Sequence, residues 1–458
     1  MSQTNLKSVK HRLTCEGEPV LLLGDTVWTI AVRFTDRQID RYLADAVRRK
    51  FNLIAVFGTP TWALRPKRAP TGKNRFGASP FRGAGSGNPW MLNRDYWERY
   101  RVLTRKAAQR GIYVMLMTGT PLANSSPFNP LDTQTKVYRY GHALGVFFRG
   151  VNRSLIWMLG QDSPAGKPDH PSGMPDWKID ACARGIADGV NGVYKPRGRS
   201  ADYGEILMSF HCQGGQVTSD HYHRKPWLDF NTFQTQWGGP GSPSGYALTV
   251  PLAARAHTRR PQKPVFCVEP CYEGHVHRDK EKKTDWHVRM EAYWSLLSGS
   301  CGHVYGADGV WNAGVPTKIL KHRVKTTLDA GLKARGRLDM QWVRKLFESK
   351  PLEGRIPDPA LILSDRHETD MTRKEYICAA RDRKGTYAFV YSTKGLGFKA
   401  DLAKLAGIPG LVRARWFDPR TGRYSAAKRC KKSARRFVPP SRGPGCDWVL
   451  VLDAHEPE

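Results

Sequence analysis

The chain has 458 residues, which is enough for one barrel of about 250 residues and a second domain. Hydrophobic residues make up 40% and aromatic residues 10% of it, a composition that excludes a disordered chain. Lys and Arg number 73 against 41 Asp and Glu, so the formal net charge is +32. This charge favours an anionic partner, which could be nucleic acid, an anionic surface or an acidic polysaccharide.

Membrane and disulfide signals are absent from the sequence. No segment reaches the roughly 18 consecutive apolar residues of a membrane span, and the polar residues 1–18 do not resemble a secretory signal. We therefore expect a cytoplasmic protein, or an exported one if the start site is misassigned. The nine Cys include no CxxC pair, so a disulfide framework is not expected.

Short apolar runs alternate with amphipathic helical segments along residues 1–350. Such alternation is typical of a parallel sheet with crossover helices, and it predicts an α/β fold, a (β/α)₈ TIM barrel. Helices are expected over 36–50, 94–110, 133–149 and 285–298, the first preceded by Thr35 as N-cap. The predicted strands are 20–23, 53–57, 112–118, 155–159, 206–211, 228–234, 265–268 and 303–305.

Three long loops rich in Gly and Pro follow the second, fourth and sixth predicted strands. They cover residues 58–89, 163–175 and 238–244. Because each leaves the carboxyl end of a strand, together they should form one rim of a cleft. Basic residues cluster in the first loop, over 65–82, and again over 428–436.

The end of the chain has a different pattern. Residues 311–350 read as two helices, 351–359 as a linker, and 360–458 as a small antiparallel β-sandwich domain. Its predicted strands include 387–391, 412–417 and 448–452, with a turn over 418–422.

Two predicted barrel strands run directly into a carboxylate, Asp162 after the fourth and Glu269 after the seventh. Barrel enzymes carry their catalytic groups at the carboxyl ends of the strands. Glycosidic cleavage needs such a pair, about 5–5.5 Å apart in retaining enzymes and roughly 6.5–9.5 Å apart in inverting ones. The pattern favours a glycosidase, although strand-end caps or ion-pair partners for the many Arg would give the same pattern.

Other predicted strand ends are polar and aromatic, which suits a polyhydroxylated ligand. No zinc-type spacing relates His211, His221 and His223, so no metal and no cofactor is expected. The candidate substrate-binding residues are Asp25, Trp28, His211, His223, Gln234, Tyr272, His303 and Tyr305.

Several of these stretches resemble the apiosidase-like glycoside hydrolases. The resemblance covers about residues 19–350. The similar segments, in chain order, are Leu23-Gly24-Asp25-Thr26-Val27-Trp28, Ile156-Trp157-Met158-Leu159-Gly160-Gln161-Asp162, Lys225-Pro226-Trp227-Leu228-Asp229-Phe230-Asn231, Lys263 to Glu273, and Gly302-His303-Val304-Tyr305-Gly306.

The resemblance implies a TIM barrel that acts on plant-type glycans, pectic and apiose-containing oligosaccharides among them. It implies a retaining reaction with Asp162 as acid/base and Glu269 as nucleophile. The tail is similar to the small β domain labelled "putative collagen-binding" that follows such barrels, through Ala388-Phe389-Val390-Tyr391 and the segment from Trp416 to Gly422. A structural brace is the favoured role for such a domain.

Two positions depart from the family pattern and leave an alternative open. Gln161 stands where members commonly have a second Gly before the acid, and His221 stands where an aromatic residue is usual. The alternative is a catalytically impaired barrel that binds an acidic glycan or another polyanion. Nucleic acid is the less favoured polyanion, because neither basic cluster carries a nucleic-acid-binding fold motif.

Overall fold

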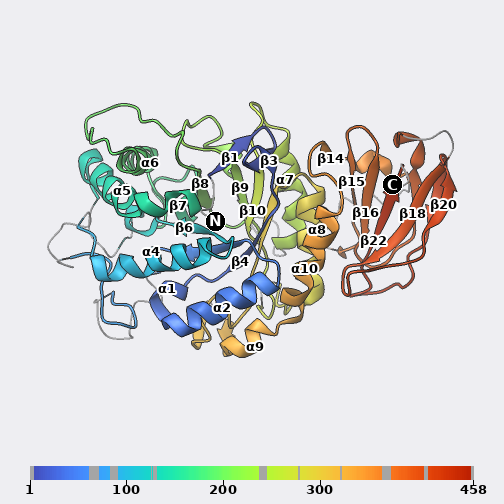
Figure 1. The fold of residues 1–458 in the computed structure, drawn as a ribbon, viewed down its shortest axis with the longest axis horizontal. Coiled ribbons are helices and arrows are strands. Elements are labelled where there is room, and N and C mark those ends of the chain that lie inside the picture. Colours follow the sequence, from blue (N-terminus) through green and yellow to red (C-terminus); the bar gives the residue numbers. More distant parts are fainter. Residues whose placement is uncertain are drawn as a thin grey trace.

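The computed structural model of the chain describes residues 5–454, apart from 61–71, 83–90, 125, 127–130, 237–244, 277–278, 320–321, 364–372 and 407–410. A barrel of parallel strands surrounded by helices is followed by a region of antiparallel sheets (Figure 1). No helix in the described part of the chain combines the length and the apolar character that a bilayer crossing requires. All nine cysteines are free thiols.

The predicted TIM barrel is confirmed. Its eight parallel strands are hydrogen-bonded in the order β8-β7-β6-β5-β4-β11-β10-β9. Hydrogen bonds between the outermost strands close it, from the Ser209 hydroxyl to the Phe230 carbonyl (2.6 Å) and from the Asp229 N–H to the Met208 carbonyl (2.9 Å). The strands are β4 (Leu22–Thr26), β5 (Leu53–Phe57), β6 (Tyr113–Met117), β7 (Leu155–Ser163), β8 (Met208–Cys212), β9 (Asn231–Gln234), β10 (Val265–Glu269) and β11 (Gly302–Tyr305).

Helices cover the outside of the barrel. The expected N-cap at Thr35 is present as a capping box, in which Gln38 returns a bond to the Thr35 backbone. The α-helices are α1 (Ile30–Arg33), α2 (Asp36–Arg48), α4 (Arg94–Ala108), α5 (Gln134–Phe148), α6 (Asp176–Asn191), α7 (Thr249–His257), α8 (Asp285–Leu297), α9 (Leu328–Leu332) and α10 (Arg335–Glu348). Residues 311–350 were predicted as two helices only, and the hairpin β12 (Thr317–Ile319) and β13 (His322–Val324) precedes them.

A short antiparallel sheet lies ahead of the barrel, where the sequence suggested no structure. It consists of β1 (Leu6–Val9), β2 (Arg12–Cys15) and β3 (Glu18–Pro19). Lys10 lies in the turn between β1 and β2 with a φ of 52°.

The C-terminal region is antiparallel, as predicted. A seven-stranded sheet packs through an apolar core on the two-stranded sheet β17-β21. The expected linker is partly structured, since residues 355–357 form β14 of the larger sheet. The strands are β14 (Arg355–Pro357), β15 (Ile377–Asp382), β16 (Tyr387–Ser392), β17 (Phe398–Asp401), β18 (Leu411–Asp418), β19 (Arg423–Tyr424), β20 (Lys428–Lys431), β21 (Ala434–Phe437) and β22 (Trp448–Asp453).

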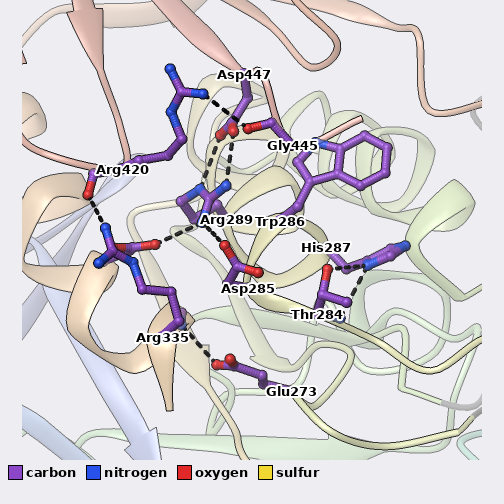
Figure 2. Close-up of polar contacts among 12 residues, drawn as sticks. Glu273, Thr284, Asp285, Trp286, His287, Arg289, Arg335, Arg420, Gly445 and Asp447 are labelled. Carbon is purple, nitrogen blue, oxygen red and sulfur yellow. Dashed lines mark hydrogen bonds and ion pairs between the residues drawn. The ribbon is translucent and has the colours of Figure 1, made fainter. Parts of the chain in front are cut away.

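Helices α8 and α10 lie between the barrel and the C-terminal sheets (Figure 1). At this joint Arg289 of α8 is buried and binds Asp447 of the C-terminal domain through Nη2 at 2.9 Å. The same guanidinium binds Asp285 at 2.6 Å (Figure 2). It also binds Asp339 of α10 at 2.7 Å. The Trp286 indole donates to the Thr393 carbonyl at 2.9 Å, so one turn of α8 holds both domains.

Candidate active site

Asp162 lies at the carboxyl end of β7, where the strand departs from regular geometry. The register between β7 and β8 shifts between Leu159 and Ser163. Gly160 has a φ of 76° and Asp162 a φ of 52°, a left-handed conformation that a non-Gly residue rarely adopts. Such strain and strand bulges concentrate at functional sites, where they redirect a side chain.

Glu269 lies at the carboxyl end of β10, where a second bulge occurs. Phe266 and Val268 face the barrel interior, and Cys267 faces the helices. Simple alternation would therefore turn Glu269 outward. The register against β9 shifts between Cys267 and Glu269, and the Glu269 carboxylate instead meets groups of the barrel mouth.

His211, at the end of β8, joins the two acids. Its Nδ1 accepts the backbone N–H of Asp162 at 2.7 Å, so its proton resides on Nε2. Nε2 lies 3.1 Å from Oε2 of Glu269. The ring is fully buried and meets the edges of Trp28 and Phe57. One imidazole thereby fixes the position of both carboxyl-bearing strand ends.

The surroundings of Asp162 favour its protonated form. Burial, followed by the charge of Glu269, raises the pKa of Asp162 to about 7. His211 and a hydrogen bond from Gln234 Nε2 to Oδ1 of Asp162, at 3.1 Å, act in the opposite direction. A carboxyl group with a pKa near neutrality can give and take a proton at physiological pH.

Glu269 is surrounded by donors. The Tyr272 hydroxyl donates to Oε1 of Glu269 at 2.7 Å, and the Trp28 indole N–H donates to that hydroxyl at 2.9 Å. Trp28 stacks on Phe57 with ring centroids 4.1 Å apart. The two consecutive hydrogen bonds orient the Glu269 carboxylate, and the stacked rings of Trp28 and Phe57 place an aromatic surface beside it.

Half of the predicted substrate-binding residues therefore gather around the two acids: Trp28, His211, Gln234 and Tyr272. Gln161, next to the acid, accepts a hydrogen bond from the Thr120 hydroxyl. His221 is exposed, and its ring packs against Gly166 in the loop after β7, where a Cβ on Gly166 would lie 2.3 Å from the ring.

The structure places Asp25 and Tyr305 on the helix side of the barrel wall. Asp25 accepts hydrogen bonds from Arg337 of α10 (3.0 Å) and from Tyr42 of α2 (2.8 Å), and it is fully buried. Tyr305 donates to Glu273 at 2.5 Å. Both belong to the contacts between sheet and helices and do not join the two acids.

The structure also places His223 and His303 away from the two acids. His223 bonds Asn231, the first residue of β9 (3.2 Å), and the Pro261 carbonyl (2.8 Å), so it lies at the amino ends of the strands. His303 pairs in register with Leu23 and Cys267, whose side chains face the helices. Burial lowers the pKa of His303 to about 3, so it is a neutral core residue.

Sequence reasoning missed a group beside Tyr272. Asp308 accepts from the Trp311 indole and contacts His275 Nδ1, each at 2.9 Å. Both rings lie within 6.4 Å of the Tyr272 ring. These residues directly follow the eighth predicted strand, as site residues of a barrel would, but the segment from residue 311 onward was predicted to be helical. No three His, Cys, Asp or Glu side chains among the described residues gather as a metal site.

The predicted loop rim is only partly described. Residues 163–175 follow β7 at the mouth, whereas 238–244 and, within the basic cluster 65–82, residues 65–71 lie outside the described residues.

Two family models match the chain. Residues 8–353 match the family model "Apiosidase-like, catalytic domain", and residues 356–453 match "Putative collagen-binding domain of a collagenase". No curated protein matches the chain.

Solved structures share the fold at low sequence identity. A glycoside hydrolase family 5 structure from Bacteroides vulgatus is 22% identical, with a TM-score of 0.80 over 98% of this chain and 92% of that one. A structure described as a glycoside hydrolase is 23% identical, with a TM-score of 0.79 over 99% and 98%. A conserved exported protein from Bacteroides fragilis is 9% identical, with a TM-score of 0.54 over 98% of both chains. Since the first family model spans most of the chain, this protein belongs to the apiosidase-like family and is a glycoside hydrolase.

Proposed function

We propose that the chain is a retaining glycoside hydrolase that acts on plant-type, pectic and apiose-containing oligosaccharides, with Asp162 as acid/base and Glu269 as nucleophile. The observation that carries the proposal is that His211 contacts both acidic residues at the barrel mouth, the backbone N–H of Asp162 through Nδ1 and the carboxylate of Glu269 through Nε2. In the first step Glu269 attacks the anomeric carbon while Asp162 protonates the departing oxygen. In the second step Asp162 takes a proton from water, which displaces Glu269.

The environments of Asp162 and Glu269 suit different catalytic roles. An acid must hold a proton at neutral pH, and the pKa of about 7 at Asp162 meets this requirement. Glu269 is fixed by the Tyr272 hydroxyl and faces the N–H of His211, which favours an oriented carboxylate. As the glycosyl bond to Glu269 forms, the negative charge near Asp162 disappears, which lowers the pKa of Asp162 and suits its change from acid to base.

A uronate-rich substrate is supported by the charge of the chain. Besides the net charge of +32, two basic residues stand directly opposite each other on neighbouring C-terminal strands, Lys399 of β17 and Arg436 of β21. Like charges in such positions disfavour the sheet. An acidic polysaccharide along these strands would offset that repulsion, so the domain would hold the substrate near the barrel.

Azide rescue tests the roles. With aryl glycosides, Glu269→Ala and Asp162→Ala should each lower kcat at least about 10³-fold. Azide should restore both, giving a glycosyl azide of inverted configuration with Glu269→Ala and of retained configuration with Asp162→Ala. NMR identifies the anomer. Asp229→Asn is the matched control, because burial also raises the pKa of Asp229 to about 7 but its Oδ2 accepts from Met208 at the opposite end of the barrel.

Three outcomes would contradict the proposal. Undiminished turnover in both Ala variants would remove the catalytic assignment. An inverted first product from the natural enzyme would exclude a retaining reaction. Salt-sensitive binding of oligogalacturonate without turnover of any glycan would favour the impaired, glycan-binding barrel.

A further inference from the structure

A cavity of about 690 Å³ lies at the amino ends of the barrel strands, opposite to Asp162 and Glu269. Its walls come from the turn between β1 and β2, the residues that precede β4 and β11, the segment 351–357, and the turn between β15 and β16. Both domains therefore contribute to it. The volume falls within the range of small-molecule sites, about 300–1,000 Å³. All of its lining residues belong to the described part of the chain.

The walls carry an excess of positive charge. Two acids are present and both are engaged: Glu353 pairs with Arg12 at 2.7 Å, and Asp382 accepts from the Thr386 hydroxyl at 2.7 Å. Basic side chains outnumber them. Within the described residues, no carboxylate lies within ion-pair distance of the other basic groups at the outer wall, which are Lys10, Arg383 and Lys384.

Two histidines on the wall respond to this charge. The rings of His11 and His257 stack with centroids 4.0 Å apart and an interplanar angle of 21°. Burial, followed by the interactions with His257, Arg260 and Arg383, lowers the pKa of His11 to about 4, and burial also lowers the pKa of His257. Both rings are therefore neutral at physiological pH, and the charge of the wall comes from its Lys and Arg side chains.

We propose that this cavity is a second ligand site, which binds a small anion with at least two carboxylate or phosphate groups. Lys10, Arg383 and Lys384 supply the positive charge that such an anion needs. An occupant would contact the barrel and the C-terminal domain together, so it would stabilise their joint. The inference does not depend on the catalytic roles of Asp162 and Glu269.

Binding and thermal unfolding of the full chain test the proposal, with digalacturonate and inorganic pyrophosphate as probes and galactobiose as the neutral control. Experiments in the Glu269→Ala background prevent turnover. Either anion should raise Tm by at least about 2 °C at saturation, because a ligand specific to the folded state stabilises it. Galactobiose should not raise it. The Arg383→Ala/Lys384→Ala variant should weaken anion binding at least tenfold, and Arg383→Lys/Lys384→Arg should retain it.

The control variant is Arg197→Ala/Arg199→Ala, two exposed basic residues between α6 and β8, away from the cavity. It should bind the anions as the parent does. Equal loss in this variant would show that only net charge matters and would overturn the proposal. Unchanged affinity in Arg383→Ala/Lys384→Ala would overturn it as well, as would the absence of any Tm shift with both anions. Since Arg383 and Lys384 are exposed turn residues, these variants should fold.

Discussion

Nε2 of His211 lies 3.1 Å from Oε2 of Glu269, while Nδ1 of the same ring accepts the backbone N–H of Asp162. The ring therefore relates the conformation of one strand end to the carboxylate of the other. Asp162 has a left-handed backbone conformation, and the bond to Nδ1 contributes to holding it there. Loss of the imidazole should displace both acids.

We expect His211→Asn to lower kcat/KM about 10²-fold, because an amide cannot make both contacts. His223→Asn is the matched control, a buried histidine at the amino ends of the strands. It should lower Tm and leave kcat/KM unchanged. Steady-state kinetics and thermal unfolding of the two variants separate positioning from stability. A His211→Asn enzyme with kcat/KM within about threefold of the parent value would contradict this role.

The pH dependence of kcat/KM should have a basic limb near pH 7, set by Asp162. The hydrogen bond from Gln234 stabilises the charged carboxylate and lowers the pKa of Asp162. Gln234→Ala should therefore raise that pKa and move the basic limb to higher pH. Glu269→Gln removes the negative charge that raises the pKa of Asp162, so the carboxyl should then titrate at lower pH.

Kinetic pH profiles measure the pKa shift in Gln234→Ala. NMR titration of the Asp162 carboxyl measures the shift in Glu269→Gln, since that variant is expected to be inactive. Asp229→Asn should leave the basic limb in place. Shifts of the same sign in the Gln234 and Glu269 variants would contradict the electrostatic account.

Replacing Tyr272 and Tyr305 separately tests which of the two hydroxyl groups contributes to catalysis. Tyr272 donates to Glu269, and Tyr305 donates to Glu273 on the helix side of the barrel. Tyr272→Phe should lower kcat about 10–100-fold, because Glu269, the proposed nucleophile, loses an orienting hydrogen bond. Tyr305→Phe should lower the free energy of unfolding by about 1–3 kcal/mol, because Glu273 loses a buried donor, and should leave kcat unchanged. Equal kinetic losses in the two variants would count against the distinction.

The sequence predicted the barrel well because its strands are short apolar runs bounded by turn residues. The predicted strand 53–57 coincides with β5, and Asp162 and Glu269 both lie at carboxyl ends of strands. Strand ends can be recognised because a polar residue interrupts an apolar run. The sequence alone could therefore place both acids at the mouth.

The side of the barrel wall that each side chain faces could not be predicted in the same way. Strands of a parallel barrel are apolar on both faces, so their sequence does not show which residues point inward. Asp25 illustrates this: it follows an apolar run, as a site residue would, but it faces α10 and pairs with Arg337. Glu269 is the converse case, since only a bulge turns it toward the mouth. Neither the partner of Asp25, more than 300 positions away, nor the bulge leaves a local signal.

The joint between the domains should depend on Arg289, whose guanidinium binds Asp285, Asp339 and Asp447 (Figure 2). Removing one partner from a buried ion-pair network leaves uncompensated charge and typically costs about 3–5 kcal/mol. Arg289→Met should therefore lower the free energy of unfolding by about that amount, measured by denaturant titration.

The matched control is Arg344→Met, because Arg344 forms a partly exposed ion pair with Glu348 within α10. Its effect should stay below about 1 kcal/mol. The proposed catalytic residues, Asp162 and Glu269, both lie in the barrel, so the Arg289 variant should keep the parent kcat at temperatures well below its Tm. Proteolysis should then release the C-terminal domain of Arg289→Met faster than that of Arg344→Met, because the broken network exposes the segment between the domains. Equal release rates would show that the apolar contacts of α8 and α10 hold the joint without Arg289.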